Sequence, residues 1–511
     1  MPKVNLHEFR YKTLWERLRA AGDFLRQHPG STLVIDPGEY VLTTDRARAT
    51  QKSVMNGEFG KVPQLVMFQP DFGYDRGLDL DGVKGCRIEA YGAVFTVDGF
   101  MEPVSVRNCK NVTVLGLTID HKRKPYSRGT VIGADDGKIT VRFGENYHIT
   151  PKMPHMRACL CDREFTRLER SVELDSMELV NEHEAVFNAR FVPEDAAGRE
   201  IYIWHTYHSR PAILIENAEN TCLKDVTVHS QPGMGVTAHG AKDILFERLR
   251  VVPADGECMS TNTDATHLAS CRGRVKYDGC LFVGQGDDGL NVHTYYHTVL
   301  SSDGNKITCK AFPPDGTHTQ TPDYFKAGDC LVKVSADTLA AEDTFRAVSV
   351  ETDGGENAVV LDHPFGETEG YFIADKDAVP DLQVVNCTMK DHLARGMLIK
   401  CPKARIENCT VERTFEYAVK IAPEASWKEG IATDEITVRG CRFTDCDRVN
   451  NLCGGIYMYS ESADRSEKIH GKITVENCRI ECPHAKNAVI LNNVREITES
   501  ENTLICKEKQ A

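Results

Sequence analysis

The first apolar residues of the chain recur with the period of a helix. They stand at i, i+4, i+7 and i+11, on one face of a helix near the N-terminus: Leu14, Leu18, Ala21 and Leu25. Farther along, valine and isoleucine alternate with polar residues in short runs, and asparagine, glycine and aspartate interrupt these runs. This second pattern predicts strands. We therefore expect an N-terminal capping helix followed by a chain made almost entirely of short strands.

The strand pattern repeats along the sequence. The segment "VRNCKNVTVLGLTI" (106–119) aligns with "IENAENTCLKDVTV" (215–228), and the apolar positions largely coincide. Within uninterrupted stretches the pattern returns after about 22 to 30 residues, at Gly82, Asn108, Asn217, Gly240, Ser270, His293, Lys400 and Ala422. A repeat of this length built from short strands is typical of a β-solenoid.

The composition of the repeat favours one solenoid class. Leucine-rich repeats have a similar period, but they require a Leu-x-x-Leu-x-Leu framework and a helical turn, which are absent from these segments. Alternating valine and isoleucine suit three short strands in each coil. We expect an all-β chain that forms a right-handed parallel β-helix.

The repeat is interrupted twice. Residues 121–207 and 295–379 contain alternating strands joined by Asp-Gly or other glycine-containing turns, which predicts two small antiparallel β modules inserted at loops. The rest of the chain divides into an N-terminal cap with the first coils (1–120), central coils (208–294) and C-terminal coils with a tail (380–511).

Charge limits the possible partners and location. The formal net charge is −14, whereas nucleic acids and anionic membranes bind clustered lysine and arginine, so we expect neither partner. No apolar run approaches the roughly 18 residues of a membrane span. The start, "MPKVNLHEFRYK", lacks the apolar core of a secretory signal. We expect a cytoplasmic location, or an extracellular or periplasmic one if a leader has been removed.

The cysteines predict packing. There are 19 of them in a long chain, which does not fit a small disulfide scaffold. We expect reduced thiols that act as small buried groups. Cys159 and Cys161, near His155, form too sparse a set for a zinc site. We expect no metal and no cofactor.

The repeat brings three aspartates together. Asp264 lies six residues before Ser270, and Asp287, which is followed by Asp288, lies six residues before His293. We expect Asp264 to stack on Asp287, because neighbouring coils are separated by about 4.8 Å. Such stacking raises the pKa of one member and contributes nothing to fold stability. It provides the acid and the base of glycoside cleavage. Turn formation or calcium binding is the alternative.

The same register predicts a mixed charged strip along one edge of the solenoid. Arg210, Arg395 and Glu416 fall on or beside the matching positions, where they either contact a sugar or form surface ion pairs. His239, His267 and His293 either lie near the site or cap strand ends. Trp427 either stacks on a sugar or packs in the core.

Two local motifs resemble known glycosidases. "NTD" (262–264), "GDD" (286–288) and the pair Arg395 and Lys400 resemble the polygalacturonase clan, glycoside hydrolase family 28, although Gly-His-Gly is absent and "RGMLIK" is longer than that family's Arg-Ile-Lys. The stretch "CMSTNTDATHLASCRGRVKYDGCLFVGQGDDGLNVH" (258–293) more closely resembles glycoside hydrolase family 110, the α-1,3-galactosidases. "WKEG" (427–430) followed by "ITVRGCRF" also resembles that family.

The resemblance implies a metal-independent hydrolase that releases terminal α-linked galactose from an oligosaccharide or glycoconjugate, with inversion. It implies acid and base roles for Asp264, Asp287 and Asp288, and substrate-binding roles for Asn262 and Lys400. A homodimer is possible. The alternatives are a polygalacturonase-like hydrolase, a lyase or epimerase on the same fold, and a non-catalytic carbohydrate-binding solenoid.

Overall fold

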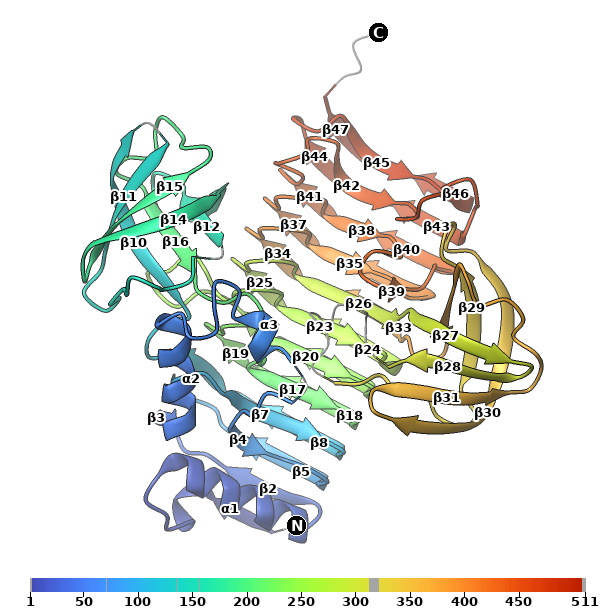
Figure 1. Cartoon of the computed structure of the whole chain (residues 1–511), viewed down its shortest axis with the longest axis horizontal. Helices are drawn as coiled ribbons and strands as arrows, with labels where there is room; N and C mark the ends of the chain where they lie inside the picture. Colours follow the sequence, from blue (N-terminus) through green and yellow to red (C-terminus); the bar gives the residue numbers. More distant parts are fainter. Residues whose placement is uncertain (1, 70, 136, 156, 312–320, 508–511) are drawn as a thin grey trace.

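The chain winds into a parallel β-helix, which confirms the predicted fold class (Figure 1). The computed structural model describes residues 2–69, 71–135, 137–155, 157–311 and 321–507. Three long parallel sheets, here called sheets A, B and C, contain 12, 11 and 11 strands. Each complete coil contributes one strand to sheet A, then one to sheet B, then one to sheet C.

The strands of the three sheets have the following bounds. Sheet A contains β1 (Lys3–Asn5), β2 (Ser31–Val34), β5 (Lys84–Glu89), β8 (Lys110–Leu115), β18 (Glu219–Lys224), β21 (Lys242–Glu247), β24 (Arg272–Asp278), β33 (Asp381–Val385), β36 (Lys403–Glu407), β40 (Glu435–Arg439), β43 (His470–Glu476) and β46 (Val494–Ser500). Sheet B contains β3 (Gly38–Thr43), β6 (Ala93–Asp98), β9 (Thr118–His121), β19 (Thr227–Val228), β22 (Arg250–Val251), β25 (Leu281–Val283), β34 (Thr388–Lys390), β37 (Thr410–Glu412), β41 (Arg442–Thr444), β44 (Arg479–Cys482) and β47 (Thr503–Cys506). Sheet C contains β4 (Arg76–Asp79), β7 (Glu102–Arg107), β17 (Ile213–Glu216), β20 (Val236–His239), β23 (Thr266–Ala269), β26 (Leu290–Tyr295), β35 (Met397–Ile399), β38 (Val419–Ile421), β42 (Cys453–Met458), β45 (Asn487–Leu491) and β39 (Glu429–Gly430), which pairs with β26.

Helices lie at the N-terminal end of the solenoid and beside its first coils (Figure 1). They are η1 (Leu6–Glu8), α1 (Leu14–Gln27), α2 (Asp45–Met55) and α3 (Gln64–Met67). Helix α1 begins with a capping box between Thr13 and Glu16. It buries Leu18, Ala21 and Leu25, the face that the sequence pattern predicted.

Two antiparallel modules lie on opposite sides of the solenoid (Figure 1). The first is a seven-stranded sheet of β10 (Tyr126–Asp135), β11 (Lys138–Phe143), β12 (Arg157–Cys161), β13 (Leu168–Val172), β14 (Leu174–Asn181), β15 (Glu184–Ala189) and β16 (Glu200–Trp204). The second is a closed barrel of β27 (His297–Asp303), β28 (Lys306–Lys310), β29 (Cys330–Ser335), β30 (Ala341–Asp353), β31 (Glu356–Leu361) and β32 (Tyr371–Asp375). Strands on either side of each insertion pair directly, as β8 does with β18 and β24 with β33, so the modules leave the coil stacking intact.

Five of the eight repeating residues lie at corners of the coils, whereas His293, Lys400 and Ala422 do not have a positive φ. Gly82, Asn108, Asn217, Gly240 and Ser270 all have φ values between 49° and 72°. This left-handed region is accessible to glycine and is tolerated by asparagine better than by most other residues. At these five positions the sequence pattern therefore repeats because the chain makes a sharp turn where it leaves sheet C.

One step of the predicted register was wrong. In the pairing of β23 with β26, Ala269 rather than Ser270 is the partner of His293. His293 does not turn a corner, because β26 continues to Tyr295 and pairs there with β39. In this register Asp264 lies opposite Asp288 and not opposite Asp287.

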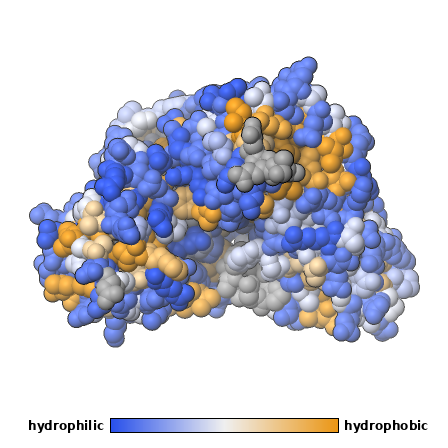
Figure 2. Space-filling model, turned by 90° about the horizontal axis from the view of Figure 1, so that it is seen from above, coloured by the Kyte–Doolittle hydropathy of each residue, from blue (hydrophilic) through white to orange (hydrophobic). Residues whose placement is uncertain are grey.

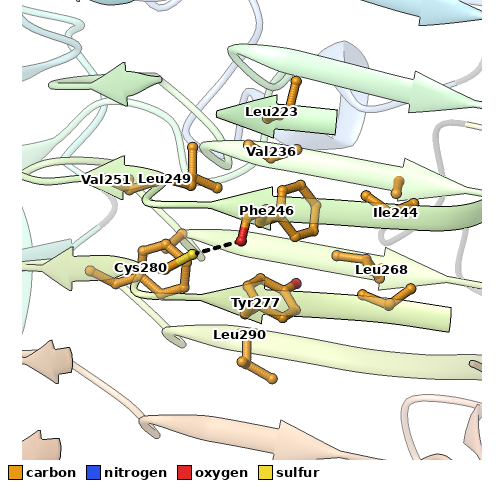
Figure 3. Close-up of a cluster of buried hydrophobic side chains, with 14 of the residues drawn as sticks. Leu223, Val236, Ile244, Phe246, Leu249, Val251, Leu268, Tyr277, Cys280 and Leu290 are labelled. Carbon is orange, nitrogen blue, oxygen red and sulfur yellow. Dashed lines mark hydrogen bonds between the residues drawn. The ribbon is translucent and has the colours of Figure 1, made fainter. Parts of the chain in front are cut away.

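The core is a continuous column of side chains inside the coils. Figure 3 shows Phe246, Tyr277 and neighbouring aliphatic residues between the sheets; the rings of Phe246 and Tyr277 are 4.7 Å apart. All 19 cysteines carry free thiols, and all except Cys222, Cys330 and Cys506 are buried, which confirms their packing role. The Cys280 thiol donates a 3.4 Å hydrogen bond to the Phe246 carbonyl.

The face of the molecule in Figure 2 is mainly hydrophilic. Figure 2 shows polar side chains over most of the face in view, with hydrophobic side chains in separate patches. In the described part of the chain, no helix combines the length and the apolar character needed to cross a bilayer.

The core predicts a stability difference between two phenylalanines. Phe246→Ala removes a fully buried ring and should lower the free energy of unfolding by about 3–5 kcal/mol. Phe191→Ala removes a ring that is 77% exposed and should change it by less than about 0.5 kcal/mol. Urea unfolding followed by circular dichroism measures both. Equal losses would contradict the position of the core.

Candidate active site

The three aspartates line one cavity of about 210 Å³ on the side of the solenoid. Its walls carry six acidic residues: Asp264, Asp287, Asp288, Glu416, Glu424 and Glu429. They also carry two arginines, Arg157 and Arg395, and four aromatic or imidazole rings, those of Tyr207, His208, His267 and Trp427. The remaining lining residues are Met234, Asn291, Leu393, Ala394 and Leu398.

Stacked loops present the principal charges. Asp264, Asp288 and Arg395 each lie two residues before a strand of sheet C, at the ends of the loops that lead into β23, β26 and β35. The coils come close at this point, because a Cβ added to Gly289 would lie 2.4 Å from the Gly396 carbonyl oxygen. Asp264, Asp288 and Arg395 are each followed by alanine or glycine, and these small residues allow the coils to stack closely.

The carboxylates form a tight cluster. Asp264, Asp287 and Asp288 each place an oxygen within 4.8 Å of the others. Asp264 Oδ2 lies 2.8 Å from His267 Nδ1, and the backbone N–H of Asp288 donates a 3.3 Å bond to Asp264 Oδ1. The predicted clustering of the acids is therefore present, although Asp288 and not Asp287 occupies the stacked position.

Burial controls the ionisation of two of the acids. Burial raises the pKa of Asp264 well above its usual range, and the adjacent Asp287 carboxylate raises it further, against the opposing effect of Arg395. Burial also raises the pKa of Asp288. Arg395 opposes this rise, because its backbone N–H donates to Asp288 Oδ1 at 2.8 Å and its guanidinium donates to Oδ2 at 2.9 Å.

The first inserted module contacts the third acid. The Tyr207 hydroxyl donates a hydrogen bond to Asp287, and Arg157 from β12 donates to the Tyr207 oxygen and, at 3.1 Å, to the Gly286 carbonyl. Burial raises the pKa of Tyr207, and the Asp287 carboxylate raises it further, so the phenol stays a hydrogen-bond donor. The module thus helps to build the site.

A buried charge network borders the cavity, because Glu424 and Glu429 belong both to the network and to the cavity wall. Lys400 is fully buried and forms ion pairs with Glu424, at 2.6 Å, and with Glu429. Lys420 pairs with the other oxygen of Glu424 at 2.7 Å. Burial opposes ionisation of Glu424, but Lys400 and Lys420 outweigh it and lower the pKa of Glu424 to about 2. The members of the network are charged, and each buried charge is stabilised by the opposite charges of its neighbours.

Several predicted binding residues line the cavity and others do not. His267, Arg395, Glu416 and Trp427 are in its wall. Lys400 lies beneath it in the network, and His293 bonds to His267 from below.

Three predicted binding residues have other partners. Arg210 is buried, 3.9 Å from Glu102, with its guanidinium over the Tyr74 ring. His239 bonds to Asp323 of the second module at 3.1 Å. Asn262 donates to the Thr206 carbonyl at 2.8 Å and so holds the segment that carries Tyr207.

No sequence pattern indicated Arg157, Tyr207, Glu424 or Glu429 as site residues. Arg157 and Tyr207 belong to the first insertion, whose position against the solenoid has no periodic signal. Glu429 lies within "WKEG", a stretch that resembles the α-1,3-galactosidases but does not by itself mark its glutamate as a site residue.

Metal binding is a geometric alternative for the site. Ligand-type atoms of Asp264, Asp287 and Asp288 lie within 4.8 Å of one another, and so do those of His267, His293 and Glu429. In both groups the atoms already bond to protein donors and acceptors such as Tyr207, Arg395 and Lys400. These hydrogen bonds and ion pairs account for the arrangement without an ion.

Comparison with known proteins identifies similar enzymes. The chain matches no family model. It is 24% identical over 465 residues to "Alpha-1,3-galactosidase A" of Shewanella woodyi, covering 84% of this chain and 73% of that protein. It is 25% identical over 509 residues to "Alpha-1,3-galactosidase A" of Bacteroides fragilis (strain YCH46), covering 92% and 81%. These matches confirm the resemblance drawn from the sequence motifs.

Two solved structures are also similar. One is named "Glycoside hydrolase" (10% identity, 98% of this chain and 97% of that one, TM-score 0.38). The other is an exopolygalacturonase from Thermotoga maritima (10% identity, 98% and 91%, TM-score 0.36).

The charge network predicts a large cost for losing Lys400. Lys400→Met leaves Glu424 and Glu429 buried without their shared cation and should lower the free energy of unfolding by about 3–5 kcal/mol. Lys403→Met, on the exposed face of β36, is the matched control and should change it by less than about 0.5 kcal/mol. A Lys400→Met protein as stable as the control in urea would show that the network contributes little.

Proposed function

We propose that this chain is a glycoside hydrolase of the galactosidase type that releases a terminal α-linked galactose from an oligosaccharide or glycoconjugate. The observation that carries the proposal is the cluster of Asp264, Asp287 and Asp288 in one cavity, with different hydrogen-bond partners for each acid. Glycoside cleavage needs one carboxyl that gives a proton to the leaving oxygen and another that activates water. The similarity to proteins named α-1,3-galactosidase supports galactose as the sugar.

The charge of the cavity favours a neutral sugar. Six acidic residues and two arginines line it. A uronate would bring another carboxylate into this acidic environment, and its repulsion would weaken binding. This argument favours galactose over galacturonate and so favours an α-galactosidase over a polygalacturonase-like enzyme.

The walls of the cavity support action at a chain end. Arg157 and Tyr207 come from the first insertion, and Trp427 comes from the loop before β39. Residues from outside the strands of the solenoid therefore surround the acids, and the space is about 210 Å³. A small walled cavity suits one terminal sugar better than the interior of a long polymer.

We propose that cleavage inverts the anomeric carbon. The closest carboxylate oxygens are nearer than the roughly 6.5–9.5 Å usual for inverting enzymes, which by itself favours retention. However, both oxygens of Asp288 accept bonds from Arg395, and those of Asp264 bond to His267 and to the Asp288 backbone. These bonds make the two carboxyls poor candidates for covalent attack, and the family resemblance implies inversion.

A screen of aryl glycosides tests the reaction. We expect aryl α-galactosides to be cleaved, and aryl β-galactosides and α-galacturonides to be poor substrates. Proton NMR of the first product should show β-galactose, the inverted anomer, before mutarotation. Release of α-galactose would contradict inversion, and no cleavage of any α-galactoside or α-1,3-linked galactosyl oligosaccharide would contradict the proposed function.

Substitution of the acids tests the assignment of the site. Asp264→Asn, Asp287→Asn and Asp288→Asn should each lower kcat by about 10²- to 10⁴-fold, because each removes a proton-transfer or charge-stabilising group. Asp303→Asn, on the exposed end of β27, is the matched control and should keep its rate. Circular dichroism checks that each variant is folded. Rates like those of the unaltered protein in all three variants would remove the catalytic assignment.

A further inference from the structure

We propose that His267 receives the proton of the attacking water through Asp264, and that His293 holds His267 in the tautomer that makes this possible. The inference rests on the proposed glycosidase function and adds two positioning residues to it. It starts from a chain of three hydrogen bonds beneath the cavity: Asp264 to His267, His267 to His293, and His293 to the backbone.

The bond between His293 and the backbone determines which atom donates in each of the three hydrogen bonds. His293 Nδ1 lies 2.9 Å from the Thr294 carbonyl oxygen. A carbonyl oxygen only accepts hydrogen bonds, so Nδ1 carries the hydrogen. The other ring nitrogen, Nε2, lies 2.8 Å from Nε2 of His267, and one hydrogen lies between these two nitrogens.

Burial then decides which atom holds each hydrogen. Burial lowers the pKa of His293 to about 3, so its ring is neutral and its Nε2 is an acceptor. His267 must therefore donate from its own Nε2. Burial also lowers the pKa of His267, and a neutral ring with hydrogen on Nε2 has a bare Nδ1. The 2.8 Å bond from this Nδ1 to Asp264 Oδ2 can form only if Asp264 supplies the hydrogen.

Asp264 is therefore a neutral carboxylic acid in the resting enzyme, with its hydrogen directed at His267. This state places a neutral carboxyl beside the Asp288 carboxylate, which pairs with Arg395, and it agrees with the raised pKa of Asp264. Its Oδ1 accepts a long 3.3 Å bond from the Asp288 backbone and retains a lone pair for water.

The proton transfers balance. As the water oxygen bonds to the anomeric carbon, its hydrogen passes to Asp264 Oδ1. The hydrogen on Oδ2 passes to His267 Nδ1 and leaves an imidazolium. The glycosidic C–O bond breaks, and the leaving oxygen takes a proton from another acid of the cluster. Exchange with solvent returns the proton from His267 to that acid.

The surrounding charges suit a transient imidazolium. Glu429 Oε1 lies 3.6 Å from His293 Nε2, and the Glu429 carboxylate is the charge that most strongly raises the pKa of His267. Asp287 and Glu424 act in the same direction, whereas Lys400 opposes it. On the two following coils, Asp288 and Arg395 form an ion pair beside Asp264. Glu429, which lines the cavity, thus favours the protonated form of His267.

Nuclear magnetic resonance of the resting protein tests the placement of the protons without any substrate. With ¹⁵N-labelled histidine, His293 should be the neutral Nδ1–H tautomer and His267 the neutral Nε2–H tautomer at pH 7. The ¹³C shift of the Asp264 carboxyl should be that of a protonated acid. A His267 imidazolium, or hydrogen on His267 Nδ1, would overturn the inference whether or not the protein cleaves galactosides.

A pair of substitutions at His293 tests the function of the chain with an aryl α-galactoside. His293→Phe removes the acceptor for the hydrogen on His267 Nε2. His267 can then carry its hydrogen on Nδ1 and donate it to an ionised Asp264. In that tautomer His267 Nδ1 cannot accept a proton from Asp264. We expect kcat to fall roughly 100-fold with KM little changed. His293→Gln restores an acceptor oxygen and should return the His267 tautomer and bring kcat to within about tenfold of the unaltered enzyme.

The outcomes are distinct. If His293→Phe keeps kcat, or if His293→Gln restores the tautomer without restoring kcat, His293 acts only through packing and the inference fails. If His293→Phe does not fold, the resonance experiment and the His293→Gln variant still decide. If the unaltered protein cleaves no α-galactoside, the proposed function fails first, and the tautomers report separately on where the protons lie.

Discussion

Hydrogen bonding of each coil to the next is the constraint on which the molecule depends. It fixes the separation of neighbouring strands and so delivers residues that are distant in sequence to adjacent positions. Thr266 pairs with Leu290 and Leu290 pairs with Met397, although the last two are separated by the whole second module. The stacking of Asp264, Asp288 and Arg395 follows from these pairings.

The site concentrates charge at a cost to the stability of the fold. Asp264 and Asp288 are buried, and burial raises the pKa of both carboxyls. Beneath them, Lys400 is enclosed between Glu424 and Glu429. Natural proteins seldom bury so many charged groups without a functional reason, because each must exchange its water for partners. The proposed proton transfer would provide that reason, and the hydrogen bonds of His267 and His293 connect the acids to the network around Lys400.

The inserted modules extend this arrangement without disturbing the coils. The first insertion places Arg157 above the loops of the solenoid, and Arg157 holds Tyr207 against Asp287. The second places Asp323 against His239 and His297. Burial opposes ionisation of Asp323, but both histidines lower its pKa well below the usual range. The solenoid therefore supplies the acids, while the first module contributes to the wall of the cavity.

The sequence alone determined the class of fold and the identity of the acidic cluster. Glycine and asparagine returned at regular intervals because each coil turns a corner with positive φ, and this local requirement is visible in any single repeat. The sequence could not give the register at Asp264, because His293 looked like a corner but continues along β26 to meet β39. It also could not give Arg157, Tyr207 or the partners of Arg210 and His239. Those contacts depend on how the modules and neighbouring segments pack against the solenoid, and only the tertiary structure decides that.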